Sequence, residues 1–234
     1  MVELEDNKEV RRAMLSAIRE HLAASMPFDA VHDEHHAEHK ANPRISSAVA
    51  DEQSASPTER FRNALEAVAG HCLMVNDERA AADLVLEILG KINARRIAVS
   101  DSLLVKRVMS HVKLDAEILV DASKSELFDC DAGITSAQWG AAETGTLVLE
   151  ADAERHRLAS LVPPVHIALI EADKIRQTLG EVLESLSEQG RDRLSRTVTF
   201  ITGPSRTSDI ELTLAIGVHG PGELFVIIIE GRDK

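Results

Sequence analysis

The chain has 234 residues, 44% of them hydrophobic and 28% charged, and 39 acidic residues against 26 basic ones give a formal net charge of −13. This composition is typical of a globular protein and excludes a fibrous or disordered chain. The acidic balance and the 3% aromatic content argue against nucleic acid as a partner, because that binding uses basic side chains on phosphates and aromatic rings for base stacking.

No apolar run reaches the roughly 20 residues that a membrane-spanning helix needs, and the charged segment 1–12 contains no apolar signal sequence. We therefore expect no membrane span and a cytoplasmic location. The two cysteines, Cys72 and Cys130, are far apart and belong to no CxxC pair. Because an iron–sulfur cluster usually needs four thiolates, we expect this chain to hold no such cofactor by itself.

Two segments precede the regular part of the chain. Residues 1–24 are predicted to form an amphipathic helix, because apolar residues recur at helical spacing: Val10, Met14, Ile18 and Leu22. Residues 25–57 lose this periodicity and are predicted to be a linker or extended arm. The tract His32–His39 mixes histidines with carboxylates and has the composition of a metal-capturing segment, but we favour a solvated loop and predict no metal site.

Strands and helices alternate from Thr58 onward. The pattern predicts a helix that ends near Gly70, a strand over 72–75, a helix capped by Asp77 that stops at Gly90, a strand over 97–100, a helix through Leu104 and Val108, and a strand over 117–120. Helix and turn are predicted for 123–145. The remainder is predicted to be strand 146–150, strand 166–170, helix 174–189, strand 198–202, an ambiguous strand over 210–216, and strand 224–230.

This alternation predicts the α/β class, with a mostly parallel sheet covered on both faces. In such folds, ligands bind beyond the carboxyl ends of the strands. Three segments rich in small polar residues are candidates for that position: 142–146, 202–209 and 217–222. The second segment combines a Gly-Pro turn with hydroxyls and Arg206, which suits a carboxylate or phosphate, although its polar groups equally suit turns and caps.

Three further side chains could have a chemical or a structural role. Glu143 is a candidate general base or nucleophile, or else an acid hydrogen-bonded to a neighbouring loop. His219 is a candidate for ligand binding or proton transfer, although an imidazole bonded to a backbone carbonyl is the more common case. His166, inside a predicted strand, is interpreted as a satisfied core or edge histidine.

Three strings in this region carry a family resemblance: AETGTLVLE (142–150), RLASLVPPVHIALIE (157–171) and ITGPSRTSDIELTLAIGVHGPGEL (201–224). In order and spacing they closely resemble the lactate utilization protein C (LutC/YkgG) family and its LUD domain. The resemblance covers roughly residues 58–230, so residues 58–234 are predicted to be a LUD domain. It implies a three-layer α/β/α sandwich like that of the NagB/RpiA/CoA-transferase superfamily.

The resemblance also implies a role in L-lactate utilization, in which three proteins together oxidise L-lactate to pyruvate. The other two resemble carriers of iron–sulfur clusters, so this chain would be the cluster-free member. The resemblance brings no catalytic residues with it. The candidate site residues are therefore hypotheses: Glu143 as the catalytic residue, and Thr144, Gly145, Thr146, Arg157, Gly203, Ser205, Arg206, Thr207, Asp209, Glu211 and His219 as ligand-binding residues.

The first functional hypothesis is thus a non-redox component that works with iron–sulfur lactate utilization proteins. The alternative is a stand-alone enzyme, similar to a CoA transferase or a sugar-phosphate isomerase, that acts on an anionic small metabolite. Glu143 would then be the reactive carboxylate and Arg206 the anion clamp. The sequence leaves open whether the chain forms a homo-oligomer.

Overall fold

The computed structural model describes residues 55–120, 122–151, 157–188, 195, 197–208, 214–216 and 220–231. All of the described residues belong to one compact unit, Ala50–Lys234. The predicted N-terminal helix, the His32–His39 tract and most of the predicted arm lie outside the described residues.

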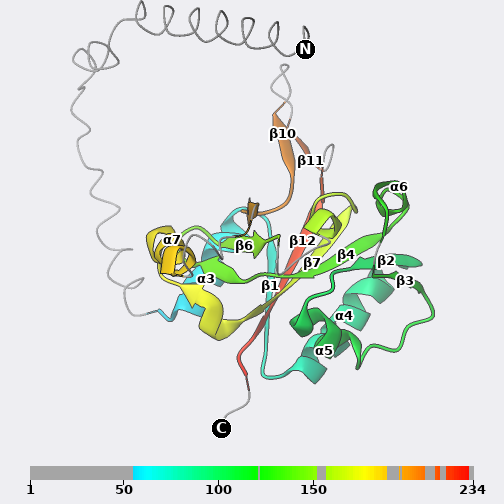
Figure 1. Cartoon of the computed structure of the whole chain (residues 1–234), viewed down its shortest axis with the longest axis horizontal. Coiled ribbons are helices and arrows are strands. Elements are labelled where there is room, and N and C mark those ends of the chain that lie inside the picture. Colours follow the sequence, from blue (N-terminus) through cyan, green and yellow to red (C-terminus); the bar gives the residue numbers. More distant parts are fainter. Residues whose placement is uncertain are drawn as a thin grey trace, which may run out of the picture. The chain divides into compact units, whose positions relative to one another are not determined.

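Six parallel strands form the central sheet (Figure 1). In spatial order they are β1 (His71–Val75), β12 (Glu223–Ile229), β7 (Val165–Glu171), β4 (Ala132–Ser136), β2 (Arg96–Val99) and β3 (Glu117–Leu119). The parallel sheet predicted from the alternation of elements is confirmed. Its strand order places the last strand of the chain between the first and the seventh.

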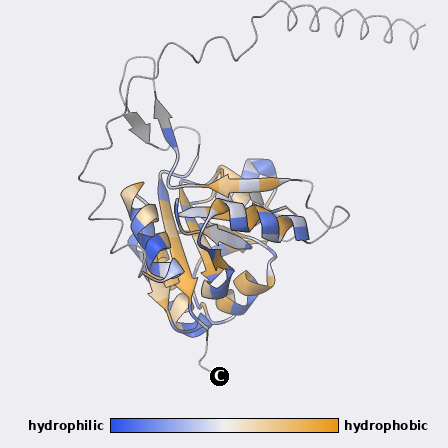
Figure 2. Ribbon diagram, turned by 90° about the vertical axis from the view of Figure 1, so that its left-hand side faces the viewer, coloured by the Kyte–Doolittle hydropathy of each residue, from blue (hydrophilic) through white to orange (hydrophobic). Residues whose placement is uncertain are grey.

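The central strands bury both of their faces, as strands covered by helices must. In β7, Ile167 and Leu169 pack with α4 (Glu78–Lys91) and α5 (Leu103–Met109). The alternate residues Ala168 and Ile170 face the opposite side, where α3 (Pro57–Ala67) contributes Phe61. Figure 2 shows the result, with hydrophobic residues along the strands and hydrophilic residues on the outer helix surfaces.

A second sheet lies on the α3 side of the central one. It contains β8 (Ile175–Arg176), β5 (Trp139–Ala141), β6 (Thr146–Glu150) and β9 (Val198–Ile201), in that order. Leu147 and Leu149 pack toward the central sheet, whereas Val148 packs against α7 (Leu179–Glu188) on the outside. The fold is a three-layer α/β/α sandwich in which one outer layer also contains this small sheet.

Short polar motifs begin the helices. Ser56 and Glu59 form a reciprocal capping box at the start of α3, which satisfies two backbone N–H groups. The Asp77 carboxylate accepts hydrogen bonds from the backbone N–H groups of Arg79 and Ala80, so the predicted cap of α4 is confirmed.

The prediction of helix and turn for residues 123–145 is wrong where two strands lie within that range. Only α6 (Lys124–Leu127) is helical, and β4 and β5 come after it. The β4 sequence AGITS is short and contains glycine, so local propensity gives little signal for a strand. Its position between β2 and β7, where all five residues are buried, stabilises it instead.

Two other boundaries also differ from prediction. The helix expected from Lys174 begins at Leu179, after the 3-10 turn η3 (Ala172–Lys174) and the edge strand β8. Part of the predicted polar loop after β9 is strand β10 (Arg206–Ser208), which pairs antiparallel with β11 (Leu214–Ile216). Within the described residues, no helix combines the length and apolar character needed to span a bilayer.

Candidate functional site

The three polar segments singled out in the sequence meet in the structure. The hydroxyl of Thr146 lies 2.7 Å from that of Thr144 and 2.7 Å from that of Thr202, which links the first segment to the second. The backbone N–H of Ser205 donates to the carbonyl of Pro221 over 2.8 Å, which links the second to the third. Segments that are far apart in sequence are thereby brought into one region.

Glycines allow two of these segments to approach the C-terminal end of α3. Gly145 has a φ of 63°, and a Cβ at that position would lie 2.4 Å from the backbone nitrogen of Leu65. Gly203 has a φ of 80°, and its Cβ would lie 2.9 Å from the carbonyl oxygen of Val68. Only glycine fits both the left-handed backbone and the short distance. The structural role of these two residues is therefore to dock the segments on α3.

A cavity of about 320 Å³ lies where the second and third segments meet. The described residues that line it come from 160–166, 200–205 and 220–224. The third segment was expected beyond the carboxyl ends of the parallel strands, and this expectation is wrong. Gly220–Gly222 lead into β12, so they lie at the amino ends of the strands, on the side that faces the small sheet.

Among the described residues that line this cavity, His166 is the one with a titratable side chain. It lies in β7, is 1% exposed, and its Nε2 lies 2.8 Å from the hydroxyl of Thr135 in the neighbouring β4. Burial lowers the pKa of His166 from 6.5 to about 3, so the ring is neutral at pH 7. Its Nδ1 has no hydrogen-bond partner in the described part of the chain. His166 was predicted to have its hydrogen bonds satisfied. It is a core histidine in which only Nε2 has a hydrogen-bond partner among the described residues.

Glu143 and Arg206 contact two different helix ends. The Glu143 carboxylate accepts a 2.7 Å hydrogen bond from the backbone N–H of Leu179, the first residue of α7. The Arg206 guanidinium donates a 2.7 Å hydrogen bond to the carbonyl of Val68, and Val68 is the C-cap residue of α3. An anion at a helix N-terminus and a cation at a C-terminus both stabilise the helix. Neither side chain is among the described residues that line the cavity.

The remaining predicted site residues are only partly described. Arg157 begins the 3-10 turn η2 (Arg157–Ser160) and Thr207 lies in β10, but only their backbones are described. Three others lie outside the described residues: Asp209, Glu211 and His219.

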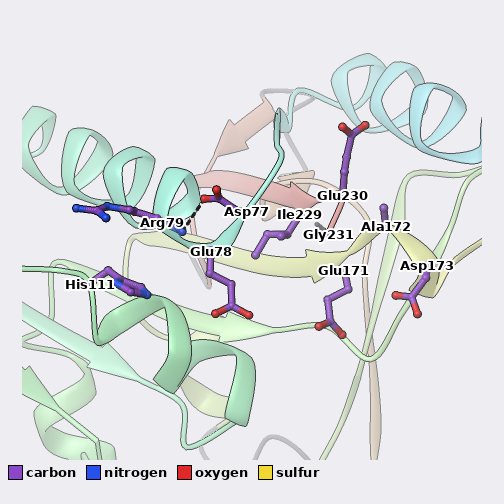
Figure 3. Close-up of a pocket in the computed structure, with 10 residues that line it drawn as sticks. All are labelled: Asp77, Glu78, Arg79, His111, Glu171, Ala172, Asp173, Ile229, Glu230 and Gly231. Atoms are coloured by element: carbon purple, nitrogen blue, oxygen red, sulfur yellow. Dashed lines mark hydrogen bonds between the residues drawn. The ribbon is translucent and has the colours of Figure 1, made fainter. Parts of the chain in front are cut away.

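A larger pocket of about 820 Å³ occupies the carboxyl ends of β1, β12 and β7 (Figure 3). Its wall is strongly acidic, and Arg107 ties two of the carboxylates together through Nε to Glu78 at 2.7 Å and Nη2 to Glu171 at 3.0 Å. The described residues contain no group of three or more side chains suited to a metal ion. Sequence reasoning missed this pocket, although the acidic residues that directly follow apolar strands, Glu171 and Glu230, were a usable signal.

Comparison with known proteins shows which family and which proteins this chain resembles. Residues 58–229 match the LUD domain. An uncharacterized protein of Neisseria meningitidis is 43% identical over 113 residues, which cover 47% of each chain. The lactate utilization protein C of Deinococcus radiodurans is 41% identical over 108 residues, 46% of this chain and 50% of the relative. The chain thus spans about half the length of these two curated relatives.

Two longer matches extend the likeness. YkgG of Escherichia coli, an uncharacterized protein, is 27% identical over 166 residues, which cover 67% of this chain and 72% of that one. The crystal structure of a DUF162 family protein from Deinococcus radiodurans superposes with a TM-score of 0.57 at 25% identity, over 75% of this chain and 99% of that chain. Because the domain match covers well over half of the sequence, the chain belongs to the LUD domain family.

Proposed function

We propose that this chain is the cluster-free component of an L-lactate utilization system, in which iron–sulfur partner proteins act with it to oxidise L-lactate to pyruvate. The observation that carries the proposal is the LUD domain match, together with relatives that are named lactate utilization protein C. That oxidation removes two electrons and two protons from the substrate, so the system needs an electron carrier. The proposal assigns that carrier to the partners.

The state of the cysteines supports this assignment. Cys72 lies in β1 and Cys130 follows α6, and both side chains are buried in separate hydrophobic clusters. Burial raises the pKa of the Cys72 thiol to about 11 and also raises that of Cys130. Iron–sulfur clusters are held by thiolates, usually four of them. Two buried, protonated thiols in different parts of the core are poor ligands for one.

The test is co-purification followed by reconstitution. The full chain should co-purify with iron–sulfur proteins from lactate-grown cells that express it, and the purified complex should reduce a dye in the presence of L-lactate. The isolated chain should not reduce the dye. A double variant with Cys72→Ala and Cys130→Ala is the matched control and should support the same rate in the complex. Lactate oxidation by the isolated chain, or absence of iron–sulfur partners, would overturn the proposal.

A stand-alone enzyme based on Glu143 and Arg206 finds less support, because both side chains are engaged at helix ends. Binding of a panel of anionic metabolites to the wild type and to Arg206→Ala separates the two ideas. Tight binding that is lost in the variant would favour the enzyme.

A further inference from the structure

The pocket of about 820 Å³ at the carboxyl ends of β1, β12 and β7 carries charged side chains of both signs. Its volume lies in the range of small-molecule sites, and its place beyond the carboxyl ends of parallel strands is where open α/β sheets bind ligands. Figure 3 shows Arg79 and His111 at one end of the pocket and Glu171, Asp173 and Glu230 at the other. The pocket thus offers a basic end and an acidic end to the same ligand.

The basic end is built by the segments around two helices. Arg79 lies in the first turn of α4, where its backbone N–H is bonded to the Asp77 carboxylate. Its side chain is exposed, and the guanidinium has no hydrogen bond or ion pair among the described residues. A guanidinium presents a planar fork of donors that matches a carboxylate, and the exposed ring of His111 beside it adds a further donor. This end therefore suits a carboxylate.

The acidic end is built by two neighbouring strands. Glu171 ends β7 and lies in register with Ile229 of β12, and Glu230 is the next residue along the chain. Arg107 holds Glu171 in place over 3.0 Å, but the same guanidinium is shared with Glu78 at 2.7 Å and so offsets only part of the negative charge. Glu230 is exposed, and its carboxylate has no partner among the described residues. An ammonium group can donate to both carboxylates here.

A ligand that reaches both ends binds better than one that reaches a single end. An ion pair at an exposed site contributes little by itself, so neither end would hold a ligand tightly. When one molecule forms both pairs, the loss of translational and rotational freedom on binding is incurred only once. A simple acid would approach the carboxylates of Glu171 and Glu230, and a simple amine would approach the guanidinium of Arg79. Like charges repel, which disfavours both of these simpler ligands.

We propose that this pocket binds a small dipolar molecule whose carboxylate pairs with Arg79 and whose ammonium group pairs with Glu171 and Glu230. The ligand belongs to the class of ω-amino acids, because the two charges of an α-amino acid are one carbon apart and do not reach opposite ends of the pocket. The site goes beyond the proposed role in lactate utilization and does not depend on it, since L-lactate has no ammonium group.

The experiment is an NMR titration of the full chain with labelled histidine rings, at low ionic strength because salt screens exposed charge pairs. The probes are γ-aminobutyrate and ε-aminocaproate, each compared with the plain acid and the plain amine of the same length. Binding is followed through the ring signals of His111, which lines the pocket and is assigned from the signals lost in His111→Gln. At least one ω-amino acid should bind at millimolar concentration, at least fivefold more tightly than its acid and its amine.

Two variants test the two ends, and both change exposed side chains, so the fold should stay intact. Arg79→Gln should weaken binding of the ω-amino acid at least fivefold and leave the weak binding of the amine no weaker. Glu230→Gln should weaken binding of the ω-amino acid at least threefold and leave that of the acid no weaker. Glu184→Gln, an exposed change in α7 outside the pocket, is the matched control and should bind like the wild type.

Three results would overturn the proposal. The first is that neither ω-amino acid moves the His111 signals. The second is that both bind no more tightly than the acid and the amine of the same length. The third is that Arg79→Gln binds the ω-amino acid as the wild type does.

Discussion

The neutral state of buried His166 makes a quantitative prediction about stability and pH. In the unfolded chain its pKa is about 6.5, whereas burial lowers it to about 3 in the folded state. Between these values the unfolded state binds the proton and the folded state does not, so stability is full above pH 6.5 and falls as the pH falls toward 3. At pH 5.5 the unfolded histidine is protonated about ten to one, which lowers the free energy of unfolding by about 1.4 kcal/mol relative to pH 7.5.

A double difference isolates this contribution from that of other titrating groups. Urea unfolding of the wild type and of His166→Gln is followed at pH 7.5 and 5.5 through the single tryptophan, Trp139, at low protein concentration because the sequence pI is about 5.2. The wild type should lose about 1.4 kcal/mol more than the variant. His111→Gln, at an exposed position, should behave like the wild type. Equal pH dependence of the wild type and His166→Gln would refute the reasoning.

Local contacts give three further expected outcomes. Gly145→Ala should lower the free energy of unfolding by more than about 2 kcal/mol, because the backbone at Gly145 is left-handed and a Cβ would overlap α3. Gly90→Ala should raise the free energy of unfolding by about 0.5–1 kcal/mol, because Gly90 lies in α4 with open space around it. Urea unfolding of the two variants measures both effects. Cys72 and Cys130 should react with a thiol reagent at pH 8 at least a hundredfold more slowly in the folded protein than in urea, because both thiols are buried; equal rates would contradict this. Glu143→Ala should lower stability by about 1 kcal/mol through the lost contact at the start of α7, and an unchanged midpoint in urea would contradict a capping role.

The elements that local pattern predicted well are those with a strong signal of their own. The helix α4 has a cap at Asp77 and apolar residues on one face, and β7 and β12 are long apolar runs. Strand β4 lacked such a signal, because its state depends on pairing with β2 and β7, which are distant in sequence. The family resemblance supplied the domain assignment that periodicity alone left open.

For the site, the order of residues was enough to identify the segments rich in glycine and hydroxyls and to show that the chain has two cysteines. What those groups contact depends on the folded chain. Glu143 lies 36 residues from its helix partner and Arg206 lies 138 from its own, so no local pattern indicates either bond. The same holds for His166, whose neutral ring and free nitrogen arise from the packing of two sheets around it, because burial is a property of the whole fold and not of the strand.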